Sequence, residues 1–216
     1  MIKNKKLALI FRICALLLST IGLVIHIGIF SGQINYITLM KYTTQSNFLA
    51  IILFTMLTIR TAKSMKNGTG ISTRWYARFK MICAINLLVT FLVYWALIAP
   101  KSENALWTFE NMLIHVITPL LCILEYIFYT KAKCLKYRDA YYSCLFPLCY
   151  VIYISIAGFL GFVYETSKDG NPVRFPYSFL DFDRIGNNAI IYIVCLLFFF
   201  ILISHLIYII DKKVRL

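Results

Sequence analysis

The stretch NNAIIYIVCLLFFFILISHLIYII, residues 187–210, decides the class of the fold. It contains no Asp, Glu, Lys or Arg and is made up almost entirely of apolar side chains. A helix needs about 20 mostly apolar residues to cross the hydrocarbon core of a bilayer. This stretch is therefore expected to form a membrane-spanning helix.

Five further segments of the chain have the same character. The six expected spans cover approximately residues 7–30, 42–60, 77–99, 108–129, 140–163 and 187–210. The second span opens with the polar run KYTTQSNF before it turns apolar, and Pro147 is expected to kink the fifth. The pattern predicts an all-α polytopic membrane protein, a bundle of six transmembrane helices that forms a single domain over residues 1–216.

The composition excludes a water-soluble globule. Of the 216 residues, 61% are hydrophobic and only 14% are charged, whereas a soluble domain is roughly half apolar and about a quarter charged. The first span follows MIKNKK and has no small-residue cleavage site, so it is expected to stay as a helix and not to be removed as a signal peptide. The expected location is an integral, multi-pass position in a membrane, the plasma membrane if the protein is bacterial.

The basic residues predict the orientation of the bundle. Seventeen of the 22 lie in four clusters: four up to Arg12, six over 60–80, four over 131–138 and three over 212–215. Cytoplasmic segments of membrane proteins carry an excess of Lys and Arg. Both termini are therefore expected in the cytoplasm. The formal charge of +13 then reflects topology, and no nucleic-acid partner is expected.

The residues that bind metals show no suitable spacing. The seven cysteines are scattered, mostly in apolar runs, where they are expected to be small buried hydrophobic residues, and no CxxC pair or Cys/His cluster occurs. We therefore expect no metal site and no cofactor. Asp181 and Asp183, in an aromatic-rich outer loop, could form a metal or acid–base pair, although solvated carboxylates are the ordinary alternative. The oligomeric state is not predicted.

The fourth span carries a polar stripe. At 100° per residue, one arc of roughly 120° contains Trp107, Asn111, His115, Thr118, Cys122 and Glu125. Such a stripe faces protein or water instead of lipid. His115 is expected about 10 Å below the outer boundary, at 1.5 Å per residue. Glu125 lies near the inner end, where we expect it to anchor the helix by an ion pair with Lys131 or Arg138.

Polar residues from other spans reach a similar depth in the outer half of the membrane. Thr43, Thr44 and Asn47 share one face at the start of the second span, and His26 ends the first. Hydroxyls in membrane helices often bond their own i−4 carbonyl, and Asn often bonds a neighbouring helix, so a structural role remains open for each. A membrane-buried histidine is a candidate for function by default, which favours His115.

Three motifs together resemble one family: KYTTQSN at the second span, WxxxNxxxHxxxP at the fourth and FPYSFLD in the last outer loop. They are similar to the androgen-induced protein/ADTRP-like family. Its characterised members are six-span threonine hydrolases that cleave fatty acid esters of hydroxy fatty acids. The resemblance implies that His115 is the catalytic histidine, with Asn111 one turn before it. It favours Thr44 as the nucleophile, with Thr43 second, and it places Glu125 at an acidic family position.

The first functional hypothesis is an intramembrane hydrolase of lipid esters, with membrane lipids as partners. His115 would take the proton from Thr44, and Asn47 or Asn111 would orient the imidazole or stabilise the oxyanion. No GxSxG or HExxH motif supports a serine hydrolase or zinc protease. The alternatives are a non-enzymatic transporter or lipid-binding protein, although no repeated halves are visible, and an acyltransferase that uses the same site.

Overall fold

The computed structural model describes residues 4–68, 73–101, 107–167 and 169–213, without the side chain of Lys101. Its helices are α1 (Lys5–Ile27), α2 (Tyr42–Asn67), α3 (Arg74–Val93), α4 (Phe109–Met112), α5 (Thr118–Tyr129), α6 (Leu145–Phe159), α7 (Phe182–Ile185) and α8 (Asn188–Lys213). Within the described residues six helices are long and apolar enough to cross a membrane, which confirms the six predicted spans. They are compatible with a multi-pass membrane protein.

Shorter turns extend three of these helices. A π-helical turn, Tyr94–Ile98, continues α3, and another, Leu113–Ile117, joins α4 to α5 into one span. A 3-10 segment, Tyr137–Cys144, precedes α6 in the fifth span. Between α6 and α7, the strands β1 (Glu165–Thr166) and β2 (Pro172–Val173) form a small antiparallel hairpin.

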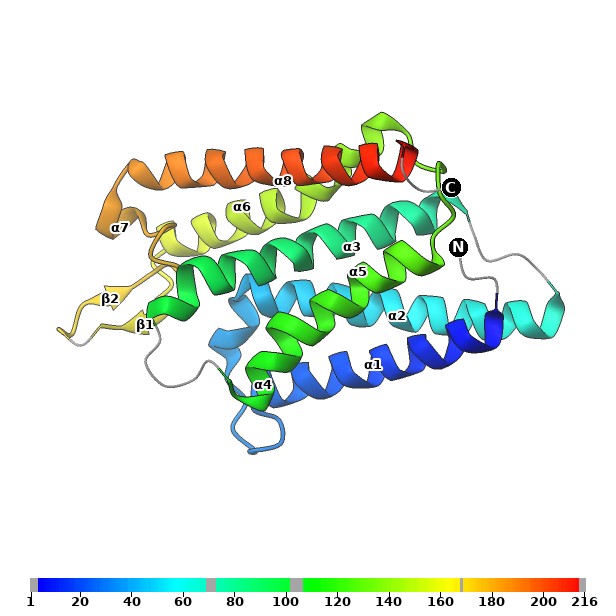
Figure 1. The fold of residues 1–216 in the computed structure, drawn as a ribbon. Helices are drawn as coiled ribbons and strands as arrows, with labels where there is room; N and C mark the ends of the chain where they lie inside the picture. The colour runs from blue at the N-terminus through cyan, green and yellow to red at the C-terminus, as the bar shows by residue number, and fades with distance from the viewer. Residues whose placement is uncertain (1–3, 69–72, 102–106, 168, 214–216) are drawn as a thin grey trace.

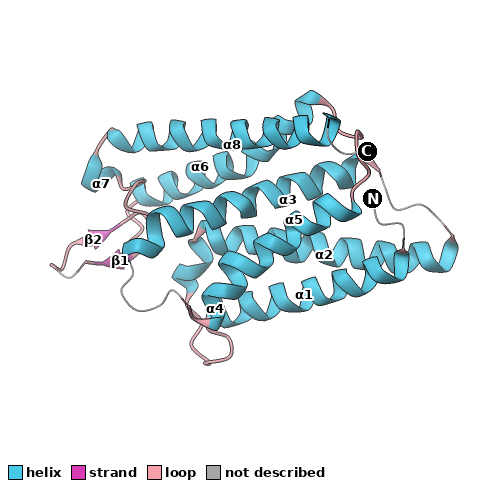
Figure 2. Ribbon diagram, viewed as in Figure 1, coloured by secondary structure: helices cyan, strands magenta, loops and turns pink. Residues whose placement is uncertain are grey.

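The spans run along a common direction (Figure 1). Helix α1 packs along α2, α3 packs on α5, and α8 and α6 lie on the other side of α3. Helix α1 begins and α8 ends at the same end of the bundle, and the ends of α2 and α5 and the start of α3 lie there too. Figure 2 shows that the strands, together with α7, lie at the opposite end. Of the charged residues on which the predicted orientation depends, Lys3 and Arg215 of the basic clusters, and Glu103 and Lys168 in the connections on the other side, fall outside the described residues.

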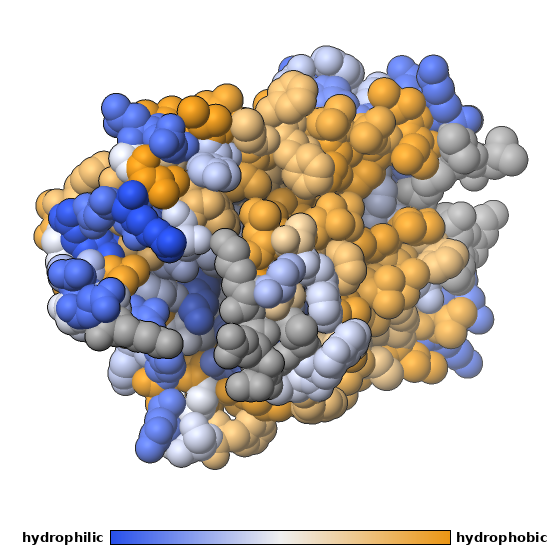
Figure 3. All heavy atoms as spheres, turned by 60° about the vertical axis from the view of Figure 1, so that its left-hand side comes forward, coloured by the Kyte–Doolittle hydropathy of each residue, from blue (hydrophilic) through white to orange (hydrophobic). Residues whose placement is uncertain are grey.

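The bundle exterior is apolar around its middle. Large hydrophobic side chains point outward from every span, among them Ile10, Ile52, Leu120, Ile156 and Phe198. Figure 3 shows hydrophobic side chains covering the flank and hydrophilic ones gathering at the end that carries the hairpin. Exposed apolar area of this extent does not suit a protein surrounded by water, and it fits a lipid environment.

Two expectations about individual residues can be compared with the structure. Pro147 is the third residue of α6, which begins at Leu145 directly after the change from 3-10 to α-helix, and the expected kink stays a prediction. A proline lacks the N–H that would bond the carbonyl four residues earlier, and the Ser143 carbonyl instead accepts from Asn86 Nδ2 at 3.3 Å. The cysteines are not all buried: Cys83 and Cys122 are, whereas Cys14, Cys149 and Cys195 are exposed on the bundle surface.

The loop after α6 docks onto the bundle through aromatic side chains. Phe175 is buried against Gly158, and its ring also packs against Phe159 and Phe182. Tyr177 reaches the start of α2, where its hydroxyl accepts a hydrogen bond from the backbone N–H of Tyr42 at 3.1 Å. These contacts form a folded cover over the end of the bundle that carries the hairpin, as the aromatic-rich sequence of the loop suggests.

The close approach at Gly158 gives a stability prediction. A Cβ atom at this position would lie 2.6 Å from the Phe175 ring, so Gly158→Ala forces the ring out of its pocket. Overpacking of this kind costs about 1–3 kcal/mol, which we expect as a lower midpoint of thermal unfolding in detergent. Phe175→Leu, added as a second substitution, should recover part of the loss. An unchanged midpoint for Gly158→Ala would contradict the tight docking of the loop.

Candidate functional site

The polar start of α2 is buried in the half of the bundle that carries the hairpin. Thr44, Ser46 and Asn47 have no exposed surface, and Thr43 has little. The Thr44 hydroxyl donates to the Thr38 carbonyl at 2.6 Å, while Ser46 Oγ donates to the Thr43 carbonyl at 3.0 Å. The helix therefore turns its hydroxyls and amide toward protein, as the sequence predicts for this face.

Asn47 ties α2 to the helix that carries His115. Its Nδ2 atom donates to the Ile114 carbonyl at 3.2 Å and to the Thr43 carbonyl at 2.8 Å. Both amide hydrogens are thus used in this arrangement, and the expectation that Asn47 orients the imidazole or stabilises the oxyanion stays a prediction. Its role is to fix the level of the Leu113–Ile117 turn against the first turns of α2.

Helix α1 also packs closely against this turn. A Cβ atom on Gly22 would lie 2.8 Å from the Leu113 Cβ atom, so only glycine permits the observed approach. Small residues allow membrane helices to pack with their backbones close together. Gly22 from one side and Asn47 from the other therefore hold the turn that carries His115.

His115 lies inside the π-helical turn and is only 5% exposed. Its ring stacks on the Tyr94 ring with 3.5 Å between centroids and 15° between planes. Within the described residues, its Nδ1 atom is buried and has no hydrogen-bond partner. A buried polar atom without a partner is costly in a membrane interior, and such exceptions call for an explanation, a catalytic role among them.

The predicted Thr44–His115 dyad is not formed in this arrangement. Among the described residues no hydrogen bond joins the two side chains, since the Thr44 hydroxyl donates to the Thr38 carbonyl. The bond from Asn47 to Ile114 nevertheless connects the two helices one turn after Thr44 and one residue before His115. The structure brings the two helices together at this level without joining the two side chains.

An apolar cavity of about 70 Å³ lies beside this layer. It is bounded by the start of α2, the end of α3, by α6 and α8, and by the loop after α6. Thr43 and Tyr94 line it, whereas Thr44 and His115 do not. Tyr177 also lines it; burial raises the pKa of this phenol, which therefore stays protonated and able to donate a hydrogen bond.

The remaining candidates near this end of the bundle have other partners. His26 lies at the end of α1, where its Nδ1 atom is 2.5 Å from Glu110 Oε1. Asn111 is half-buried in α4, and its backbone N–H donates to Thr108 Oγ1 at 3.2 Å. Trp107 departs from the predicted stripe, since it precedes α4 and is 76% exposed.

Asp181 and Asp183 do not form a metal or acid–base pair. Asp181 Oδ1 accepts from the backbone N–H groups of Asp183 and Arg184 and so caps the short helix α7. Asp183 forms an ion pair with Arg174. No group of three or more His, Cys, Asp or Glu side chains suitable for a metal ion occurs in the described part of the chain.

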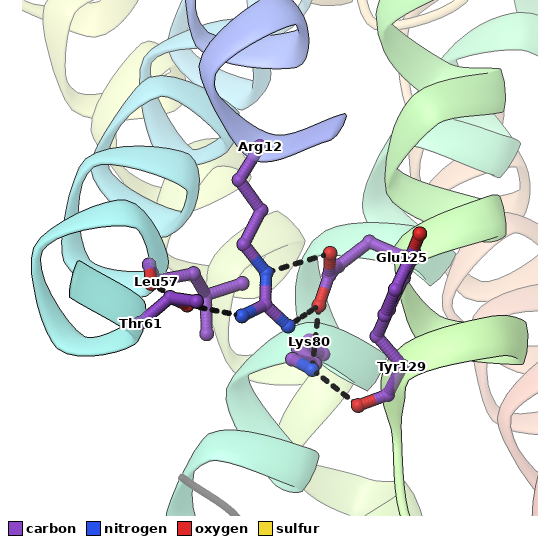
Figure 4. Close-up of polar contacts among 6 residues, drawn as sticks. All are labelled: Arg12, Leu57, Thr61, Lys80, Glu125 and Tyr129. Carbon is purple, nitrogen blue, oxygen red and sulfur yellow. Dashed lines mark hydrogen bonds and ion pairs between the residues drawn. The ribbon is translucent and has the colours of Figure 1, made fainter. Parts of the chain in front are cut away.

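Toward the end of the bundle where α1 begins, three charged side chains from three spans meet (Figure 4). Arg12 of α1 binds the Glu125 carboxylate through two hydrogen bonds, Nε to Oε2 at 3.0 Å and Nη2 to Oε1 at 2.6 Å. Lys80 Nζ of α3 lies 2.6 Å from Glu125 Oε1 and donates to the Tyr129 carbonyl at 2.9 Å. We call Arg12, Lys80 and Glu125 the ion cluster.

The ion cluster is buried inside the bundle. Arg12 is 2% exposed, Lys80 4% and Glu125 0%. The Arg12 guanidinium also donates to Thr61 of α2, whose hydroxyl in turn donates to the Leu57 carbonyl. The cluster thus joins four spans with two positive charges and one negative charge. Because burial of ions is costly, this arrangement depends on complete pairing of the carboxylate.

The predicted partners of Glu125 were therefore wrong. Lys131 and Arg138 are exposed, and Arg12 and Lys80, assigned above to the cytoplasmic clusters, lie within the spans. A signal was present in the sequence: each of the two cations lies about 10 Å inside its span, at 1.5 Å per residue from Lys5 and Arg74. The sequence also gives no indication of Tyr94 as a site residue. Its ring stacks on a ring from another span, and such a contact leaves no periodic pattern in the sequence of either span.

Comparison with known proteins adds nothing to this geometry. No family model, no curated protein and no solved structure matches the chain.

Proposed function

We propose that this protein is an intramembrane hydrolase of lipid carboxylic esters, related to the androgen-induced protein/ADTRP-like family that its motifs resemble. The observation that carries the proposal is the buried His115 imidazole with an unpartnered Nδ1 atom, at the level where α2 presents buried threonines. An apolar cavity lined by Thr43 lies beside it and is suited to the hydrocarbon part of a lipid.

The proposed reaction has two half-reactions. The Thr44 hydroxyl leaves the Thr38 carbonyl and attacks the ester carbonyl carbon while His115 takes its proton. The tetrahedral intermediate collapses, and the alcohol leaves with the proton from His115. Water then attacks the threonine ester, again with His115 as base, and releases the carboxylic acid and the free hydroxyl.

The surrounding groups have supporting roles in this proposal. Thr44 lies in the first turn of α2, where backbone N–H groups lack partners within the helix and can stabilise an oxyanion. Asn47 keeps the two helices at one level through Ile114. Asn111 precedes the imidazole by one turn, as in the family motif.

The proposed orientation follows from the charges. Both termini lie in the cytoplasm and the site lies in the outer half of the membrane, because the basic clusters gather at the end where α1 begins and α8 ends. A lipid ester would then reach the site from the outer leaflet, with its polar bond near the interface.

A second candidate is a lipid-binding or transport protein without catalysis. The specific observation in its favour is that neither Thr44 nor His115 lines the cavity. In that case Thr43 and the tyrosines would hold a lipid headgroup or carboxylate while the aliphatic wall holds its chain. An acyltransferase differs from the hydrolase only in the acceptor of the second half-reaction.

Product analysis separates these candidates. The purified protein in detergent is incubated with fatty acid esters of hydroxy fatty acids and with simpler long-chain esters, and acids, alcohols and exchanged esters are quantified. We expect free acid and alcohol in equal amounts. Exchanged esters without acid would indicate the transferase. Binding or vesicle uptake of intact ester, with no product, would contradict the hydrolase and support the second candidate.

A further inference from the structure

The Tyr94 ring separates the cavity from His115. One of its neighbours is the His115 ring, at 3.5 Å between centroids and nearly parallel. Tyr94 also lines the cavity, on which Thr43 borders as well. Rings at this separation are in van der Waals contact, so no atom of water or ligand fits between them. While the stack holds, a carbonyl group in the cavity does not meet that face of the imidazole.

Both rings of the stack belong to irregular helix. Tyr94 begins the π-helical turn at the end of α3, and His115 lies in the middle of the π-helical turn between α4 and α5. Turns of this kind are rare within α-helices and occur frequently at functional sites. Here one π-helical turn carries each of the two stacked rings, so irregular backbone lies on both sides of the stack.

The contacts of the His115 turn differ in how firmly they hold it. Gly22 of α1 packs closely against Leu113, and Asn47 of α2 donates to the Ile114 carbonyl, so both contacts tie the turn to a neighbouring helix. Toward the cavity, the neighbour is an aromatic side chain, which moves by rotation about its own bonds without displacing a helix. The cavity supplies empty volume into which such a ring can turn.

We propose that Tyr94 is a movable partition and a positioning residue: its ring holds the imidazole in the closed state and turns aside to join the cavity to His115. The catalytic part of this role rests on the proposed function, because it explains how an ester in the cavity reaches a buried base. The partition itself is a statement about access and is testable without catalysis.

Access to His115 is measured with diethyl pyrocarbonate, which modifies neutral imidazoles that it can reach. The chain has three histidines, so His26 and His205 are internal references in the same peptide map. If the open state is populated at about 1–10%, Tyr94→Ala should raise the rate at His115 by roughly ten- to a hundredfold. Rates at the other two histidines should not change.

Two matched variants separate the partition from general loosening. Tyr94→Phe keeps a stacked ring and should modify as slowly as the unaltered protein. Val93→Ala shortens a side chain that lines the same cavity and so enlarges the cavity, but it keeps the Tyr94 ring in place. It should also leave the rate of modification at His115 unchanged. Thermal unfolding of each variant checks that it is folded.

The outcomes distinguish this inference from the proposed function. A selective rise at His115 in Tyr94→Ala, with no ester hydrolysis by any variant, supports the partition and contradicts the hydrolase. Equal rates at His115 in Tyr94→Ala and the unaltered protein overturn the partition, whether or not esters are cleaved. A rise in Val93→Ala as large as that in Tyr94→Ala also overturns it.

Discussion

Glu125→Gln is expected to lower the free energy of unfolding by about 3–5 kcal/mol, the cost of breaking a buried ion pair by removing one partner. The substitution leaves Arg12 and Lys80 close together without a counter-charge, both nearly fully buried. Glutamine preserves the size of the side chain, so the effect reports charge and hydrogen bonding and not a cavity. Equilibrium unfolding in a denaturing detergent measures it.

Two controls make this result specific. Glu165→Gln removes the same charge from an exposed position in β1 and should change the free energy of unfolding by less than about 0.5 kcal/mol. The triple variant Arg12→Met, Lys80→Met, Glu125→Leu removes all three charges and should recover most of the loss, because apolar replacement of a buried ionic group is often neutral. Equal effects of Glu125→Gln and Glu165→Gln would contradict the account of the ion cluster.

Thr44→Ala is expected to abolish ester hydrolysis and His115→Ala to slow it strongly, while the protein stays folded. Loss of a general base alone reduces the rate by about 10²–10⁴-fold, and loss of the nucleophile prevents the acyl intermediate. Because the two residues act as a unit, the double variant should be no slower than the slower single variant. Turnover of a long-chain ester at saturating concentration measures these effects.

Matched variants test the assignment of each residue. Thr58→Ala removes a hydroxyl from the same helix, and His205→Ala removes a histidine from the C-terminal half of α8; both should keep the activity. Thr44→Ser keeps a nucleophilic hydroxyl and should retain measurable turnover. Thr43→Ala should mainly raise KM, since Thr43 lines the cavity. Loss of turnover in Thr43→Ala with activity kept in Thr44→Ala would reassign the nucleophile.

The membrane architecture was predictable because it depends on composition over long windows. Segments of about 20 apolar residues are visible without any knowledge of packing, and all six are present as helices. Their bounds differ most at the end of α2, which continues to Asn67. There α2 continues past the apolar segment into a stretch with basic residues. A search for apolar segments does not detect this part of the helix.

The partners of the charged groups were less predictable. Glu125 was expected to bond cations that are near in sequence, yet its partners come from α1 and α3. Pairing between spans depends on which helices are neighbours, and one sequence contains no direct record of that. The buried positions of Arg12 and Lys80 did leave a trace, since both lie within spans where charge is costly.

The candidate site was predictable as a layer but not as a geometry. Burial of Thr43, Thr44, Asn47 and His115 is confirmed, and it follows from helical periodicity. The stack of Tyr94 on His115 was not foreseen, and neither was the bond from Thr44 to Thr38. Both depend on π-helical turns and on the segment before α2, where the regular spacing of an α-helix does not apply.

Mapping of a covalent adduct tests the central claim most directly. The purified protein is treated with a long-chain fluorophosphonate, which phosphonylates an activated hydroxyl and releases fluoride, and the modified residue is identified by mass spectrometry. We predict one adduct on Thr44, absent from Thr44→Ala and strongly reduced in His115→Ala. Equal labelling of the unaltered protein and both variants would contradict a threonine nucleophile activated by His115.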